Sequence, residues 1–169
     1  MGPDRTQAGL ILGALLLTTP ALGQAPGWHY SPLPGEGDRA TLGCDREATS
    51  EQFTCLAVRC EDDFATGVHV HTSRNPVLGT WQMTLDRENA SFVAEPSDAP
   101  YGGRFVEDAD FLLDRIAQGT FIYLRHADNP GGFAYIDLTG SLFAINQALA
   151  WCAPRAPAGE PNAGTDVIR

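Results

Sequence analysis

The placement of four cysteines limits the folds open to this chain more than any other feature. Two of them, Cys55 and Cys60, lie in the segment FTCLAVRCEDD, where apolar and polar residues alternate as in a β-strand. Side chains five positions apart on a strand point to opposite faces, so these two cysteines should not pair with each other if the strand is continuous. We therefore favour the disulfides Cys44–Cys55, which closes a short loop, and Cys60–Cys152, which ties this strand to a C-terminal helix.

The alternative role for these cysteines is a metal site, but there is no CxxC pair and no histidine at zinc-finger spacing. Disulfides require an oxidising compartment, and the N-terminus is consistent with one. The apolar run LILGALLLTTPALG is shorter than a membrane span and has the length of a signal-peptide core. Ala21 and Gly23 suit a cleavage site, so we expect residues 1–23 to be a signal peptide and the mature chain to begin at Gln24. The sequence thus predicts a periplasmic or secreted protein without a stable membrane span after cleavage.

The charge of the chain argues against two classes of partner. The chain has 21 acidic residues against 11 basic ones, a formal net charge of −10 at pH 7. Nucleic acids and anionic membrane surfaces are bound by basic faces. We therefore expect no nucleic-acid partner.

The mature sequence divides into an arm, one domain and a tail. Residues 24–43 are rich in proline and glycine and are predicted to form a loose arm, whereas residues 44–152 carry the periodic segments of a single domain. Residues 153–169 have too little apolar surface to fold and are predicted to be a disordered tail. Six segments of the domain alternate as strands do: 55–60, 67–72, 81–86, 90–95, 120–127 and 131–138. The first four are expected to form an antiparallel meander, and the last two a hairpin around the turn DNPGG.

Two segments have helical periodicity instead. Apolar residues at 109, 112, 113, 116 and 117 predict a helix over 107–118 that ends at Gly119. Ser141 is expected to cap a second helix, whose apolar face would comprise Leu142, Ile145, Ala148, Leu149 and Cys152. The predicted fold is α+β: an antiparallel sheet of about six strands with two helices packed on one face, stapled by disulfides.

Four stretches, LAVRCE, TWQMTLD, DRIAQG and IDLTGSLFAINQALAWC, make up a pattern that covers about residues 53–152. This pattern resembles small exported bacterial proteins of unassigned function, and its layout is similar to that of the type VI secretion-associated VasI family. The shared positions are mostly core and cysteine positions. The resemblance therefore implies a fold much more than a role, and no functional residue is carried over from it.

Histidines form the sharpest local chemical feature. His69 and His71 would leave the same face of one strand, and such a pair can chelate zinc or copper, with His126 near the end of another strand as a third ligand. The alternative is that His69 and His71 are solvent-facing polar residues that alternate with the apolar Val68 and Val70. Nothing in the sequence places His126 beside them.

The sequence offers few side chains for catalysis, because the cysteines are expected to form disulfides and only 4 histidines are present. We therefore expect no cofactor and favour an exported, non-enzymatic binding or accessory protein. It would contact another protein of the cell envelope through an exposed face or edge of the sheet. The alternatives are a metal-binding module that uses His69 and His71, and an envelope hydrolase that uses an acidic pair.

Overall fold

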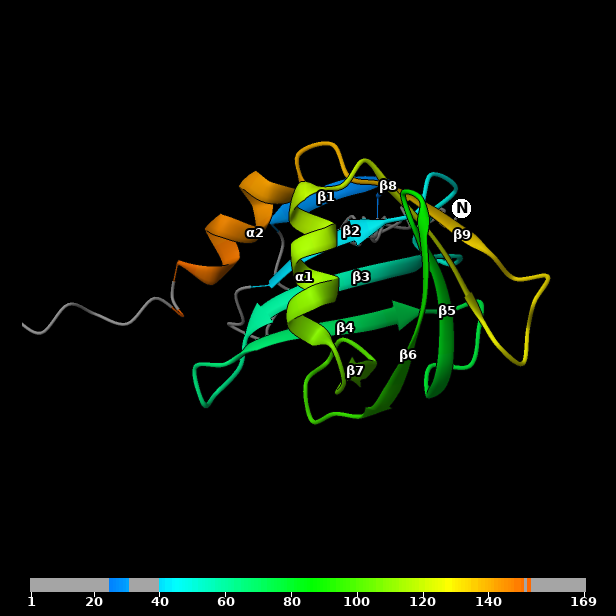
Figure 1. Ribbon diagram of the computed structural model, residues 1–169, viewed down its shortest axis with the longest axis horizontal. Coiled ribbons are helices and arrows are strands. Elements are labelled where there is room, and N and C mark those ends of the chain that lie inside the picture. The colour runs from blue at the N-terminus through cyan, green and yellow to red at the C-terminus, as the bar shows by residue number, and fades with distance from the viewer. Residues whose placement is uncertain (1–24, 31–39, 151, 153–169) are drawn as a thin grey trace, which may run out of the picture.

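A computed structural model describes residues 25–30, 40–150 and 152, which form one nine-stranded sheet and two helices (Figure 1). The strands are β1 (Gly27–Tyr30), β2 (Ala40–Cys44), β3 (Thr54–Cys60), β4 (Thr66–Thr72), β5 (Gly79–Leu85), β6 (Glu88–Pro96), β7 (Gly103–Phe105), β8 (Phe121–His126) and β9 (Ala134–Asp137). The helices are α1 (Ala109–Gln118) and α2 (Ser141–Leu149). The order across the sheet is β1-β2-β3-β4-β7-β6-β5-β8-β9, and all neighbours are antiparallel. The predicted α+β class is confirmed.

The sheet is strongly curved, so its two edge strands approach each other. The indole Nε1–H of Trp28 on β1 donates a hydrogen bond to the backbone oxygen of Asp137 on β9 at 3.0 Å. The backbone N–H of Arg46, just after β2, donates to the oxygen of Tyr135 on β9 at 3.1 Å. We call the concave side of the sheet the inner face and the opposite side the outer face.

The main hydrophobic core lies on the inner face, where both helices cover it. Figure 1 shows α1 lying across β3 and β4, with α2 beside β1. Leu112 and Ile116 of α1 and Ile145 of α2 are buried against strand residues from both halves of the sheet. The strand residues of this core include Leu56, Val58, Val68, Val70, Trp81, Met83, Phe92, Ile122, Leu124 and Ile136. Burying a large apolar side chain contributes roughly 1.5–3 kcal/mol, so this core supplies most of the drive for folding.

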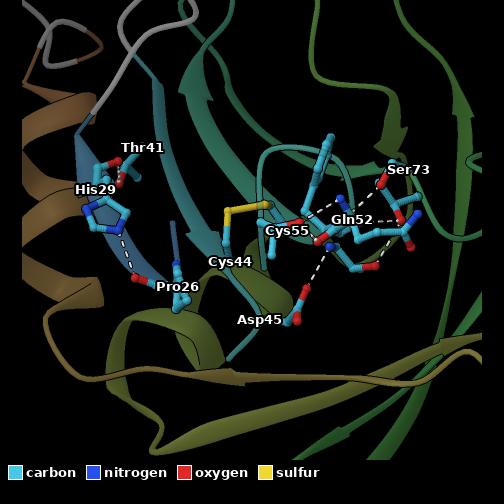
Figure 2. The surroundings of a disulfide bond; sticks show 12 residues. Pro26, His29, Thr41, Cys44, Asp45, Gln52, Cys55 and Ser73 are labelled. Carbon is cyan, nitrogen blue, oxygen red and sulfur yellow. Dashed lines mark hydrogen bonds between the residues drawn. A yellow bond between two sulfur atoms is a disulfide. The ribbon is translucent and has the colours of Figure 1, made fainter. Parts of the chain in front are cut away.

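Both disulfides expected from the cysteine spacing are present, and they lie on opposite faces of β3. Cys44 and Cys55 are joined on the outer face, where both residues are buried (Figure 2). Cys60 is joined to Cys152, just beyond α2, and this bridge is only partly buried. The first bridge therefore joins neighbouring strands, whereas the second ties α2 covalently to the sheet.

The second helix begins in a way that the sequence did not predict. Ser141 does not cap it: the residue before the first turn is Gly140, whose φ of 85° is in the left-handed region that glycine tolerates. Ser141 is buried, and its hydroxyl donates to the backbone oxygen of Ile116 at 2.7 Å. This hydrogen bond fastens the start of α2 to α1. Leu142, expected on the buried face, is 52% exposed.

The expected number of about six strands was too low, because three short strands were not recognised from the alternation of apolar and polar residues. β1 and β2 lie within the stretch expected to be a loose arm, residues 24–43, with β2 ending at Cys44. β7 pairs with β4 and with β6, so the predicted four-strand meander is wrong: β4 and β5 are not neighbours. β7 has only three residues, and a side chain on Gly102 just before it would collide with the backbone oxygen of Val70. A strand this short, beginning among glycines, has no readable periodicity.

Some predictions concern residues outside the described part of the chain. The segments predicted to be a signal peptide, residues 1–23, and a disordered tail, residues 153–169, lie there. Among the residues that the structure describes, no helix is long and apolar enough to cross a membrane. The two disulfides indicate an oxidising, non-cytoplasmic environment.

Candidate functional site

The outer face differs between the two halves of the sheet, and the predicted histidine pair lies in the half that is covered. Over β2, β3 and β4 a second apolar cluster fills this face; we call this half the covered face. Its buried members are Ala40, Leu42, Cys44, Ala48, Phe53, Cys55, Ala57 and Tyr101. His69 and His71 belong to the same side, because Val68 and Val70 point to the inner core.

The segment after β2 lies over the covered face because Asp45 holds it there. The buried Asp45 carboxylate accepts the N–H of Thr54 at 2.7 Å, the N–H of Glu47 at 2.9 Å and a guanidinium N–H of Arg74 at 3.1 Å. The Arg74 guanidinium also donates to the backbone oxygen of Gln52 at 2.9 Å. Figure 2 shows Asp45, Gln52 and Ser73 grouped around the Cys44–Cys55 bridge. These bonds satisfy the polar groups that the cover buries.

His69 is therefore not a solvent-facing residue. It is fully buried, and its Nε2–H donates to Oε1 of Glu61 at 2.7 Å, since an ionised carboxylate can only accept. Glu61 also forms ion pairs with Arg59 and, at 3.6 Å, with Nε of Arg104. Gly67 makes room for this contact, because a Cβ there would overlap the Glu61 carboxylate. Nδ1 of His69 has no partner among the described residues.

The charges around Glu61 keep its carboxyl group ionised. Burial by itself raises the pKa of Glu61, but the hydrogen bond from His69 and the charges of His69, Arg59 and Arg104 outweigh burial and hold this pKa below its usual range. A general acid of a hydrolase needs a raised pKa instead. This carboxylate is suited to holding β3, β4 and β7 together rather than to donating a proton.

The three histidines proposed as metal ligands do not come together. His71 packs on the ring of Phe53 at 4.8 Å between centroids, and burial lowers the pKa of His71. His126 lies on β8, with β7, β6 and β5 between it and β4, and it points to the inner face beside Trp81. Its Nε2–H donates to the oxygen of Leu78 at 2.8 Å, while Nδ1 accepts the N–H of Asp128 at 3.2 Å, so neither nitrogen is available to a metal.

Other combinations of metal-ligating side chains in the described part of the chain lead to the same conclusion. Within residues 25–30, 40–150 and 152, no group of three or more His, Cys, Asp or Glu side chains is placed to hold a metal ion. The metal-binding alternative therefore has no three-ligand site in this part of the chain.

The outer face of the other half, over β6, β5, β8 and β9, is open; we call it the open face. The strand register places its side chains in two rows that cross the strands. One row runs Tyr135, Tyr123, Thr84 and Asn89; the other runs Arg125, Gln82 and Ser91. The inner neighbours of these residues, such as Met83 and Leu124, belong to the core. The rows are therefore anchored on a rigid part of the sheet.

Hydrogen bonds hold the polar members of the rows in place. Arg125 donates its Nε–H to Oε1 of Gln82 at 2.9 Å, and the hydroxyl of Thr84 donates to Oδ1 of Asn89 at 2.8 Å. These side chains form the floor of a groove with a volume of about 580 Å³. Pro130 and Phe133, from the loop between β8 and β9, contribute to its lining. Grooves of roughly 300–1,000 Å³ accommodate small ligands.

Aromatic rings extend the open face beyond the groove. The ring of Tyr123 is 4.8 Å from that of Tyr135 and 5.3 Å from that of Phe121, measured between centroids. The Arg46 guanidinium lies over the Tyr135 ring at 3.9 Å, and it also pairs with Asp137 at 3.1 Å. Tyr123 is 43% exposed and Phe133 is 64% exposed. Exposed aromatic and arginine side chains of this kind are typical of recognition surfaces.

Sequence reasoning identified the strands of the open face but not the site. The alternation in WQMTLD predicts that Gln82 and Thr84 point away from the core, and they do. The pairing of β5 with both β6 and β8, which aligns these residues with Ser91 and Arg125, is not visible in the sequence.

Comparison with protein-family models, with curated proteins and with solved structures gives no significant match for this chain.

Proposed function

We propose that this chain is an exported, non-enzymatic binding or accessory protein of the cell envelope and that it binds its partner through the open face. The observation that carries the proposal is the contrast between the two outer faces. Loops and a disulfide bury the apolar cluster and His69 on the covered face, and His71 is partly buried there. The open face instead presents aromatic and hydrogen-bonding side chains around a groove.

Two features support a binding role over catalysis. In the described part of the chain, the groove lining contains no histidine, cysteine or carboxylate, so the hydroxyl groups of Thr84, Ser91 and Tyr123 have no general base beside them in this lining. The most heavily paired carboxylate, Glu61, is ionised and tied to two arginines on the covered face. A surface without such groups can position and hold a partner, but it has little to offer a bond-breaking step.

The localisation part of the proposal is tested by mass. Protein recovered from outside the cytoplasm should have the mass of a chain that begins at Gln24. Recovery only in the cytoplasm, or with residues 1–23 retained, contradicts export by a cleaved signal peptide.

The binding part is tested by retention on washed envelope fragments from the source cells. The mature protein should sediment with the fragments, and the double substitution Tyr123→Ser with Arg125→Ser should release it. Phe143→Ser is the matched control, because Phe143 is an aromatic residue with 77% exposure on α2. Equal retention of both variants would place the binding surface elsewhere, and no retention of the unmodified protein would contradict the proposal.

A further inference from the structure

The charge of the groove sets limits on its ligand. Among the described residues that line it, Arg125 is the single charged side chain, in a chain whose net charge is −10. The other polar groups are neutral amides and hydroxyls: Gln82, Thr84, Asn89, Ser91 and Tyr123. A cationic ligand would find no counter-charge in this lining. The groove therefore suits a neutral or weakly acidic ligand with many hydrogen-bonding groups.

The hydrogen bonds within the groove floor leave both donors and acceptors available to such a ligand. Arg125 uses Nε–H for Gln82, and the terminal N–H groups of its guanidinium remain as donors. Gln82 retains its two amide N–H donors, and Thr84 retains oxygen lone pairs after donating to Asn89. The register sets these donors and acceptors side by side across three strands. A row of adjacent hydroxyl groups, each able to donate and accept, complements such a floor.

The aromatic side chains add flat apolar surfaces next to the polar floor. Tyr123 and Phe133 both line the groove and are both substantially exposed. An aromatic face attracts the slightly positive C–H groups of a ligand ring, as it does the edges of other rings. A sugar ring presents C–H groups on its faces and hydroxyls around its rim. This combination of polar floor and aromatic surface matches the two kinds of surface on a saccharide.

The position of the groove argues against a peptide that binds by adding a strand to the sheet. β5 is paired with β6 on one side and with β8 on the other, so its backbone groups are already used. Peptides that add a strand need a free sheet edge. Recognition here must come from side chains alone.

Resting on the proposed function, we infer that the open-face groove binds an oligosaccharide, through the rows of Gln82, Thr84 and Arg125 and by stacking on Tyr123 and Phe133. The volume of about 580 Å³ holds a few sugar units rather than a globular surface. The ligand is thus a glycan component of the envelope.

Chemical treatment of the envelope fragments tests the inference. One sample is digested with protease, which removes exposed protein, and another is oxidised with periodate, which cleaves sugars at adjacent hydroxyls. We expect retention to survive protease and to be lost after periodate. Loss after protease with no effect of periodate would identify a protein partner and overturn the inference, while the proposed function would stand. No retention on untreated fragments would overturn both.

Two further arms identify the source of the glycan and the residues that bind it. Detergent-insoluble polysaccharide that carries adjacent free hydroxyls and detergent-extracted glycolipid are tested separately, and binding to neither overturns the inference. Tyr123→Ser should weaken binding to the glycan about tenfold, the value of one good stacking contact. Gln82→Ala is the second variant, chosen because the exposed Gln82 contributes nothing to the core, and it should weaken binding severalfold. Phe143→Ser should leave binding unchanged, and equal affinity of all three variants contradicts the site.

Discussion

The two halves of the outer face are built from strands of one sheet, yet they differ in what covers them. Over β2, β3 and β4 the face carries Cys55, Ala57 and the fully buried His69, and loops close over it. Over β5 and β8 it carries Gln82 and Arg125, which remain exposed. The difference teaches that one half of this face is part of the folding unit, whereas the other half leaves its side chains exposed. Substitutions on the covered face should therefore cost stability, whereas those on the open face should cost binding.

The largest effect is expected from the disulfides that fasten the covered half. In the chain-entropy model, removing Cys60–Cys152, with a sequence separation of 92, costs about 5 kcal/mol of unfolding free energy. Removing Cys44–Cys55, with a separation of 11, costs about 3 kcal/mol. Urea titrations of the two double Cys→Ala variants measure the difference. Equal losses would show that the long-range attachment of α2 adds nothing beyond a local bridge.

A matched pair of tyrosines gives the sharpest test of the comparison. Tyr101 is fully buried on the covered face, so Tyr101→Ala should lower the unfolding free energy by about 4 kcal/mol, as for other large aromatic truncations. Tyr123 is 43% exposed on the open face, so Tyr123→Ala should change it by at most about 1 kcal/mol. Thermal unfolding of both variants decides this. A large loss for Tyr123→Ala would mean that the open face is structural as well.

The ion cluster around Glu61 should cost somewhat less when broken. Glu61→Gln leaves the fully buried His69 without its carboxylate partner and removes the ion pair between Glu61 and Arg59, while Arg59 keeps its contact with Asp62 at 3.8 Å. We expect a loss of about 3 kcal/mol. The folded pKa of Glu61 is lowered from 4.5, so its contribution is complete above pH 4.5 and is lost as the pH falls through the folded pKa. Denaturant titrations of the unmodified protein and of Glu61→Gln, from pH 7 to below pH 4.5, measure how the difference in unfolding free energy depends on pH. A constant difference between them across that range would contradict the coupling.

The smallest effect is expected from His71, which sits at the margin of the covered face. Burial lowers its folded pKa from 6.5, so the unfolded state takes up a proton first. Its stability contribution is therefore complete above pH 6.5 and declines as the pH falls toward the folded pKa. Replacing His71 by Gln should remove this step from the stability profile between neutral pH and the onset of the Glu61 effect. An unchanged profile would show that His71 does not titrate with unfolding.

Strong local patterns predicted much of this fold. The period of α1 placed Leu112 and Ile116 in the core, and the spacing of Cys55 and Cys60 predicted that one strand would be stapled on both faces. Patterns that rest on only a few residues, such as a helix cap, were less reliable. Ser141 has the chemistry of a helix cap, but the left-handed Gly140 takes that position and the hydroxyl bonds to α1 instead. The nearest polar partner in space, not in sequence, decided its role.

The sequence by itself determined which side chains could share a face, because alternation along a strand and the helical repeat are properties of the local backbone. It thus separated Val68 and Val70 from His69 and His71, and Trp81 and Met83 from Gln82 and Thr84. Only the tertiary structure decided which of these faces is covered. That outcome depends on β7 pairing between β4 and β6 and on the Asp45 loop closing over β3, which are contacts between segments far apart in the chain. A polar residue opposite the core can be buried or exposed, and the local pattern is the same in both cases. His69 and Gln82 therefore look alike in sequence, yet one holds the fold together and the other lines the groove.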